Sequence, residues 1–141
     1  MTKKYIGTKI VTAFPQEKDG KPGYGVIYAD GYTSWSPKEV FEESYRAIER
    51  EGQALNFGDA LHMLKLGKKV TRSGWNGSGM FAYLVPAASY QAQTGVAKAH
   101  FGDDAKVPYR AYLALKTAQG DVATWAPSCS DALAEDWQVV E

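Results

Sequence analysis

Residues 69–85 read KVTRSGWNGSGMFAYLV, and this stretch decides the fold. Its first three residues predict a short strand, and the glycine-rich residues 72–79 predict a loop. From Met80 to Val85 the side chains alternate, with Phe81, Tyr83 and Val85 on one side and the remaining three on the other. This period of two is typical of a strand, so the stretch predicts two strands joined by a loop.

The flanking residues extend this pattern in both directions. Asn56 and Asp59 have the spacing of a helix N-cap, an apolar stripe follows, and Gly67 suits the C-terminal end of that helix. Downstream we expect strands over 109–116, 122–125 and 137–140, a turn at Gln119-Gly120 and a short helix capped by Ser128. Residues 87–107 are predicted to be a long loop or flap, with room for a short helix.

Residues 4–49 predict a smaller group of elements. We expect strands over Tyr5–Phe14, Tyr24–Tyr28 and Tyr32–Trp35, with a tight hairpin turn at Asp30-Gly31. A helix capped by Ser36 should follow and end near Glu49, and residues 49–54 suit a polar linker. The fold class is therefore α+β, a mostly antiparallel sheet with short helices. The expected domains are a small strand-strand-helix module over 1–54 and a second domain over 55–141.

Composition narrows the classes of function. The 141 residues hold 45% hydrophobic and 23% charged residues, an ordinary globular balance. Lys+Arg and Asp+Glu both number 16, and this zero net charge disfavours a DNA partner, because phosphate neutralisation drives such binding. No apolar run approaches a membrane span, and no signal peptide is visible, so we expect a cytoplasmic protein.

Residues for catalysis are scarce. The chain has two histidines, His62 and His100, neither in a metal-binding pattern, and a single cysteine, Cys129. Cys129 starts a predicted helix, where a thiolate is favoured, but a lone cysteine in a small domain is more often explained by packing or chance. Phosphate-loop and dinucleotide patterns are missing from the sequence. We therefore expect no catalytic residues, no metal and no cofactor.

Two segments suit ligand binding instead. In the loop 72–80, Arg72 could pair with phosphate, Trp75 could stack on a nucleobase and Asn76 could contact a base or ribose edge. Trp125-Ala126-Pro127-Ser128 offers a second stacking wall beside a helix N-terminus. The alternative is structural: Trp75 as a core plug in a glycine-rich turn and Trp125 as a core lid. For Trp137 we favour a structural role.

The order of several motifs carries a resemblance. These motifs are 56–61 (NFGDAL), 66–72 (LGKKVTR), 74–77 (GWNG), 80–86 (MFAYLVP), 116–120 (KTAQG), 125–128 (WAPS) and 131–137 (DALAEDW). In combination they resemble the phage Thoeris anti-defense family of the second type, over about residues 55–141. Minimal members of that family lack residues 1–54, the expected N-terminal phage module. Within it, residues 31–41 (GYTSWSPKEVF) resemble a module that recurs in phage proteins.

The resemblance implies a mechanism. Members bind a cyclic ADP-ribose isomer, the signal of the Thoeris defense, without cleaving it, and some also hold cyclic dinucleotides of the CBASS defense. They are homotetramers with pockets between subunits and act in the host bacterial cytoplasm. Carried onto this sequence, the resemblance implies a ligand-binding role for Asn56, Phe57, Arg72, Trp75, Asn76, Tyr83, Trp125 and Ser128.

Three alternatives remain open from the sequence. The first is a phage structural or protein-interaction module with no small-molecule ligand. The second is an enzyme that degrades the cyclic signal, which would need acid and base groups that the sequence does not identify. The third is a nucleic-acid binder, which the zero net charge disfavours.

Overall fold

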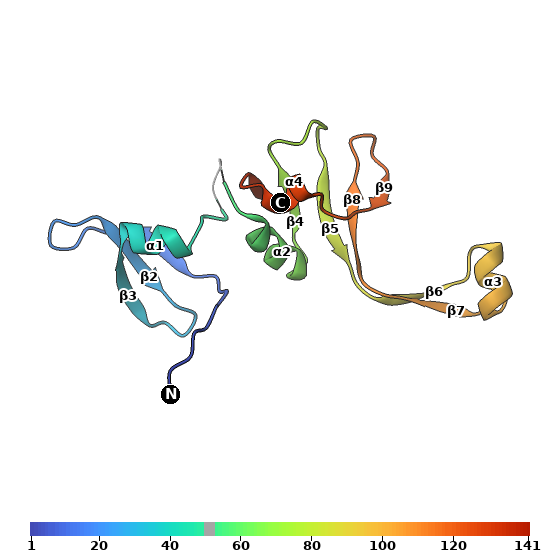
Figure 1. Ribbon diagram of the computed structural model, residues 1–141, viewed down its shortest axis with the longest axis horizontal. Coiled ribbons are helices and arrows are strands. Elements are labelled where there is room, and N and C mark those ends of the chain that lie inside the picture. Colours follow the sequence, from blue (N-terminus) through green and yellow to red (C-terminus); the bar gives the residue numbers. More distant parts are fainter. Residues whose placement is uncertain (50–52) are drawn as a thin grey trace. The chain divides into compact units, whose positions relative to one another are not determined.

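A computed structural model describes residues 1–49 and 53–141, and the chain divides into two compact units, Met1–Arg46 and Ala47–Glu141 (Figure 1). In the described residues the structure forms antiparallel sheets and short helices, which confirms the α+β fold class. Residues 50–52 of the predicted linker 49–54 lie outside the described residues.

The first unit is a three-stranded antiparallel sheet with one helix. Strands β1 (Thr12–Pro15), β2 (Gly23–Ile27) and β3 (Thr33–Pro37) pair in that order, and α1 (Lys38–Ser44) follows β3 directly. α1 covers one face, because Phe41 stacks on Tyr24 with ring centroids 4.3 Å apart. The hairpin between β2 and β3 turns at Gly31, whose φ is +88°. Asp30 keeps a negative φ, and the Tyr28 N–H donates to Tyr32 O, so residues 29–31 form the turn instead of the two residues expected.

Three expectations for this unit were wrong in their bounds or caps. The first strand begins at Thr12, not Tyr5, because β2 ends opposite Thr12 and offers no further partner. The helix ends at Ser44 instead of near Glu49. Ser36 does not cap this helix, because it is still paired within β3 and the N-cap position falls on Pro37.

The second unit is built on a five-stranded antiparallel sheet. Its order is β10 (Trp137–Val140), β4 (Lys69–Arg72), β5 (Phe81–Val85), β8 (Tyr112–Lys116) and β9 (Val122–Thr124). These strands confirm the sequence-based expectations to within a few residues, and Gly120 makes the predicted turn before β9 with a φ of +100°. The glycine-rich loop therefore joins two neighbouring strands, β4 and β5.

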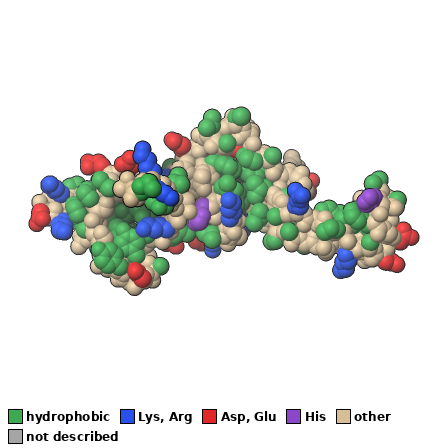
Figure 2. Space-filling view, turned by 60° about the horizontal axis from the view of Figure 1, so that its bottom comes forward, with side chains coloured by type: hydrophobic (Ala, Val, Ile, Leu, Met, Phe, Trp, Pro, Cys, Tyr) green, Lys and Arg blue, Asp and Glu red, His purple; other side chains and the backbone are tan. Residues whose placement is uncertain are grey.

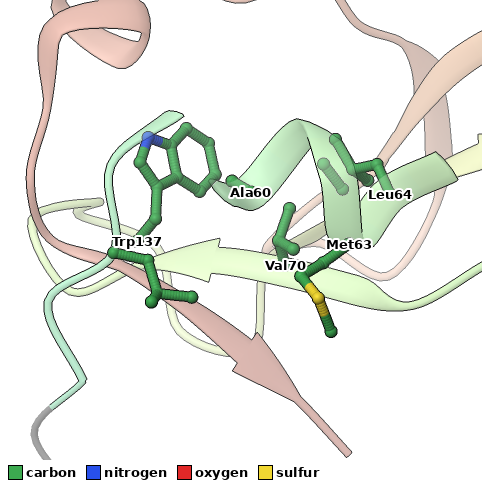
Figure 3. Close-up of a cluster of buried hydrophobic side chains, with 7 residues drawn as sticks. Ala60, Met63, Leu64, Val70 and Trp137 are labelled. Carbon is green, nitrogen blue, oxygen red and sulfur yellow. The ribbon is translucent and has the colours of Figure 1, made fainter. Parts of the chain in front are cut away.

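The core of this unit lies between one helix and the sheet (Figure 3). α2 (Phe57–Lys65) packs on β4, β5 and β10, and a short helix, α4 (Cys129–Leu133), lies beside it. The fully buried side chains include Leu55, Leu64, Val70 and Trp137. Trp137 is 0% exposed, which confirms its structural role.

Residues 87–107 are more ordered than the sequence indicated. They form a separate two-stranded ribbon, β6 (Ala88–Gln91) and β7 (Lys106–Tyr109), with α3 (Gly95–Phe101) at its tip. The expectation of a long loop was wrong, although a short helix is present. Thr94 caps that helix through its side chain, a signal that the sequence contained. The strand expected over 109–116 is broken at Arg110-Ala111, where the ribbon meets β8.

Candidate functional site: an aromatic cluster around Asp131

Four aromatic side chains of the second unit pack together beside the start of α2. Trp75 lies edge-on to Trp125 and Trp137, with centroid distances of 6.1 and 5.4 Å and interplanar angles of 76° and 80°. Phe57 adds a fourth ring, 6.4 Å from Trp125 and 5.5 Å from Trp137. Trp137 is buried, whereas Trp75 and Trp125 are only half-buried and keep part of their surface exposed. Edge-to-face packing of this kind holds aromatic rings in fixed orientations.

Asp131 joins this cluster to the loop and to α4. Its Oδ1 accepts hydrogen bonds from Trp75 Nε1 at 3.0 Å and from Arg72 Nη1 at 2.8 Å. Its Oδ2 accepts from the backbone N–H of Ser128 at 3.1 Å. The backbone oxygen of Asp131 also accepts a bond from Trp137 Nε1 at 2.9 Å. One residue therefore fixes two of the three indole rings.

Arg72 lies between two carboxylates. Besides Asp131, its Nε donates to Asp136 Oδ1 at 2.8 Å. Asp136 Oδ2 accepts the backbone N–H of Gly74 at 2.7 Å, so the same group anchors the start of the glycine-rich loop. A guanidinium held in this way has most of its donors occupied. Arg72 therefore helps to anchor the loop, and its guanidinium does not present a free pair of donors to a phosphate group.

The three charged groups shift one another's pKa. Hydrogen bonds from Arg72 lower the pKa of Asp136, against the effect of partial burial. Burial raises the pKa of Asp131, but hydrogen bonds from Trp75, Arg72 and Ser128 outweigh it, and the net shift is downward. Hydrogen bonds to Asp136 and Asp131 raise the pKa of Arg72. All three groups are therefore charged at neutral pH and together carry one net negative charge.

Asn56 and Ser128 both cap helices next to the aromatic cluster. Asn56 Oδ1 accepts from Asp59 N at 2.8 Å, and Ser128 Oγ accepts from Asp131 N at 3.1 Å. Each forms a full capping box, which confirms both predicted caps. Because both side chains act as acceptors here, the Asn56 amide hydrogens and the Ser128 hydroxyl hydrogen are left to donate.

The last two predicted site residues lie elsewhere. Asn76 follows Trp75 in the loop and is exposed. Tyr83 lies on the opposite face of the sheet, because its neighbour Ala82 points into the core and successive strand residues alternate. There it lines an open concavity of about 270 Å³, together with Gly67, Lys69, Phe81, Leu84, Lys116 and Val122. Of the eight predicted residues, Arg72, Trp75 and Ser128 bond to Asp131, and Phe57 and Trp125 join them through the aromatic cluster. Asn56 and Asn76 are chain neighbours of Phe57 and Trp75, and Tyr83 is separate.

The part of the chain that holds this site matches a known protein family. Residues 55–140, which include the whole aromatic cluster, match the family described as Thoeris anti-defense 2-like domain. The chain belongs to this family. A relative from Bacillus phage SP01, named Thoeris anti-defense 2, is 39% identical over 87 residues, which cover 61% of this chain and 94% of the relative.

Membership of the Thoeris anti-defense 2-like family supports a phage anti-defense role for this chain. The match leaves residues 1–54 outside it, so the three-stranded first unit is an addition to the family domain. On the face shown in Figure 2, basic and acidic side chains are interspersed with hydrophobic ones, and no single charge dominates that face.

Two residues of the Thoeris anti-defense 2-like domain were missed by sequence reasoning. Asp131 and Asp136 hold Arg72 and the loop, yet neither was a candidate. The Ser128-x-x-Asp131 spacing of a capping box signals the first of them. No local pattern signals Asp136, because its partners Arg72 and Gly74 lie more than 60 residues away in sequence.

The described residues hold no metal site and no membrane-spanning helix. In the two described ranges, no group of three or more His, Cys, Asp or Glu side chains is arranged to hold a metal ion. Over the same residues, no helix has the length and hydropathy needed to cross a bilayer. Cys129 is exposed at the first position of α4.

Proposed function

We propose that this chain captures a cyclic nucleotide immune signal in the host cytoplasm and sequesters it without cleaving it. The observation that carries the proposal is the pair of half-buried indoles, Trp75 and Trp125, held edge-to-face by buried Trp137. Rings fixed in advance lose little entropy on binding. A nucleobase stacked on one indole gains on the order of 1–3 kcal/mol.

The ligand class follows from family membership together with this geometry. A cyclic ADP-ribose isomer of the Thoeris defense or a cyclic dinucleotide of the CBASS defense would present a base to the indoles. The donors left on Asn56 and Ser128, with Phe57 and exposed Asn76, would contact base and ribose edges. Because the Arg72 network is net negative, we place phosphate groups away from Asp131.

The resemblance gives Tyr83 a role in binding the same ligand as Trp75, and its position would then require an assembly of several copies. Tyr83 and Trp75 lie on opposite faces of one sheet, so a single ligand reaches both only when they come from different copies. A homotetramer with shared pockets, as the resemblance implies, meets this condition. No cofactor, DNA or membrane partner enters the proposal.

The test is capture followed by release. The full chain is incubated with the signal made by a Thoeris sensor, and in parallel with cyclic dinucleotides, then filtered and heated. Loss of a ligand from the filtrate and its intact return on heating support sequestration. Loss without return indicates an enzyme. If every ligand stays in the filtrate, the alternative of a phage structural or interaction module takes precedence.

Site variants sharpen the test. Trp75→Ala is expected to weaken capture by roughly 5- to 150-fold, because stacking is worth on the order of 1–3 kcal/mol. Trp35→Ala is the matched control, since Trp35 is a half-buried tryptophan of the first unit, outside the family match. Equal loss in both variants, with both folded by circular dichroism, would remove Trp75 from the site.

A further inference from the structure

Residues 4–11 of the first unit form a segment with the composition of a strand but no strand partner. The sequence KYIGTKIV holds three β-branched aliphatic or threonine residues in alternation, Ile6, Thr8 and Ile10. In the structure these residues are not paired, and their large side chains face solvent: Tyr5 is 88%, Ile6 100% and Ile10 50% exposed.

Residues 4–11 lack a strand partner because β2 ends too early to pair with them. β1 pairs with β2 up to Thr12 opposite Ile27, and there β2 ends and the chain turns back at Gly31. Residues 4–11 therefore run past the end of the hairpin. The other edge of β1 carries no strand within the described part of this unit. The backbone groups of a strand-forming segment are left to water, and such an edge is a template for pairing with another chain.

We propose that residues 4–12 pair antiparallel with the same residues of a second copy, about a two-fold axis at Thr8. This register places Ile6 opposite Ile10, Tyr5 opposite Val11 and Lys4 opposite Thr12. Apolar residues meet apolar residues, and no two like charges face each other. The interface is self-complementary, as a two-fold axis requires.

Two alternative registers are poorer. Moving the axis to Gly7 would place Tyr5 opposite Lys9 and Ile10 opposite Lys4. Shifting the pairing by three residues would place Lys4 opposite Lys9, and facing like charges destabilise a sheet. The axis at Thr8 pairs both isoleucines with each other.

Side-chain direction adds a second argument. In a paired, extended strand, alternation from Phe14 would place Ile10 and Ile6 on the sheet face that α1 leaves open. On that face Phe14 is 45% and Ile27 38% exposed. Lys9 points the other way, since its Nζ lies 4.5 Å from the ring centroid of Tyr28. Pairing of two copies would therefore join their apolar strips into one and continue both sheets through β1.

Disulfide formation tests whether Thr8 of one copy faces Thr8 of the other. Residues directly opposite each other in an antiparallel pair have Cα atoms about 4.5–5.5 Å apart, within the range of a disulfide. In the full chain with Cys129→Ser, Thr8→Cys is expected to form disulfide-linked dimers at least ~10-fold faster than Thr2→Cys, because pairing raises the local thiol concentration. Thr2 lies in the same exposed segment but far from its own copy in this register. Equal rates would overturn the proposal, including when the second unit brings copies together.

A charge exchange tests the register. Ile6→Asp should slow the cross-linking of Thr8→Cys, because a carboxylate then faces Ile10 of the second copy. Adding Ile10→Lys should restore the rate, because the new charges face each other across the pair. Failure of the double variant to recover would overturn the axis at Thr8. Circular dichroism checks that each variant keeps its fold.

Discussion

The Trp75 indole N–H donates a 3.0 Å hydrogen bond to Asp131, although 56 residues separate the two in sequence. This bond ties the glycine-rich loop between β4 and β5 to α4. The same carboxylate accepts from Arg72, whose other partner, Asp136, holds the backbone of Gly74. The orientation of the proposed stacking ring therefore depends on residues that need not touch a ligand.

Loss of the Asp131 charge should loosen this arrangement. Asp131→Asn weakens the hydrogen bonds from Arg72, Trp75 and Ser128. Because a hydrogen bond to a charged group contributes about 1.5–3 kcal/mol, we expect the free energy of unfolding to fall by about 2–3 kcal/mol. Urea denaturation followed by tryptophan fluorescence measures this. Asp103→Asn, at an exposed position, is the control and should change little. A variant as stable as the parent would show that Asp131 is not a structural hub.

Stability should fall in acid. The folded-state pKa values of Asp131 and Asp136 lie below the ordinary value of about 3.9, so the unfolded chain binds more protons. Their contribution is complete above about pH 5 and is lost as the pH falls through the folded values. Denaturation midpoints from pH 7 to pH 3 measure the slope. In Arg72→Gln the slope should be shallower, and an unchanged slope would contradict this assignment.

The glycines of β2 should resist substitution. A β-carbon on Gly25 would overlap the Phe14 ring, so Gly25→Ala forces the ring away and should cost about 1–3 kcal/mol. Gly95→Ala is the matched control, because nothing lies within 4 Å of its β-carbon position at the start of α3. It should be neutral or stabilise by up to about 1 kcal/mol. Hydrogen exchange of the β2 amides measures the effect of Gly25→Ala, and exchange of the α3 amides measures that of Gly95→Ala. Protection of β2 in Gly25→Ala equal to the parent would contradict the prediction.

Complementation should follow if Tyr83 and Trp75 of different copies share a ligand. Trp75→Ala and Tyr83→Ala are each expected to lose capture when expressed alone. When the two are co-expressed, mixed assemblies contain some pockets with both residues intact, so part of the capture should return. Filter retention of the Thoeris signal measures it. Absence of recovery, with mixed assemblies demonstrated by affinity tags, would place the two residues in different sites.

Much of the second unit was predictable because its signals are local. The capping boxes at Asn56 and Ser128, the glycine after α2 and the alternation over residues 80–85 each depend on residues within a few positions of one another. Strand bounds in the first unit were less predictable. Tyr5–Val11 has the composition of a strand, but whether it pairs depends on where β2 ends.

The site was only partly predictable, because some of its contacts join residues that are far apart in the sequence. The aromatic candidates Phe57, Trp75 and Trp125 do meet, because each flanks an element of the core. Whether the Arg72 guanidinium is free to bind a ligand depends on Asp131 and Asp136, which lie 59 and 64 residues away in sequence. Tyr83 was grouped with Trp75 from the family pattern, and only the strand geometry reveals that the two occupy opposite faces.

The ribbon β6–β7 has a consequence for how this domain can diversify. It leaves β5 and β8 after their register is set by five residue pairs, and it has its own hydrogen bonds and a capped helix at its tip. Length and sequence at α3 can therefore change without shifting the strands that carry the Trp75 loop. A heterologous loop grafted between Gln91 and Lys106 should leave the aromatic cluster intact, so the ribbon is a natural insertion point for engineering new contacts.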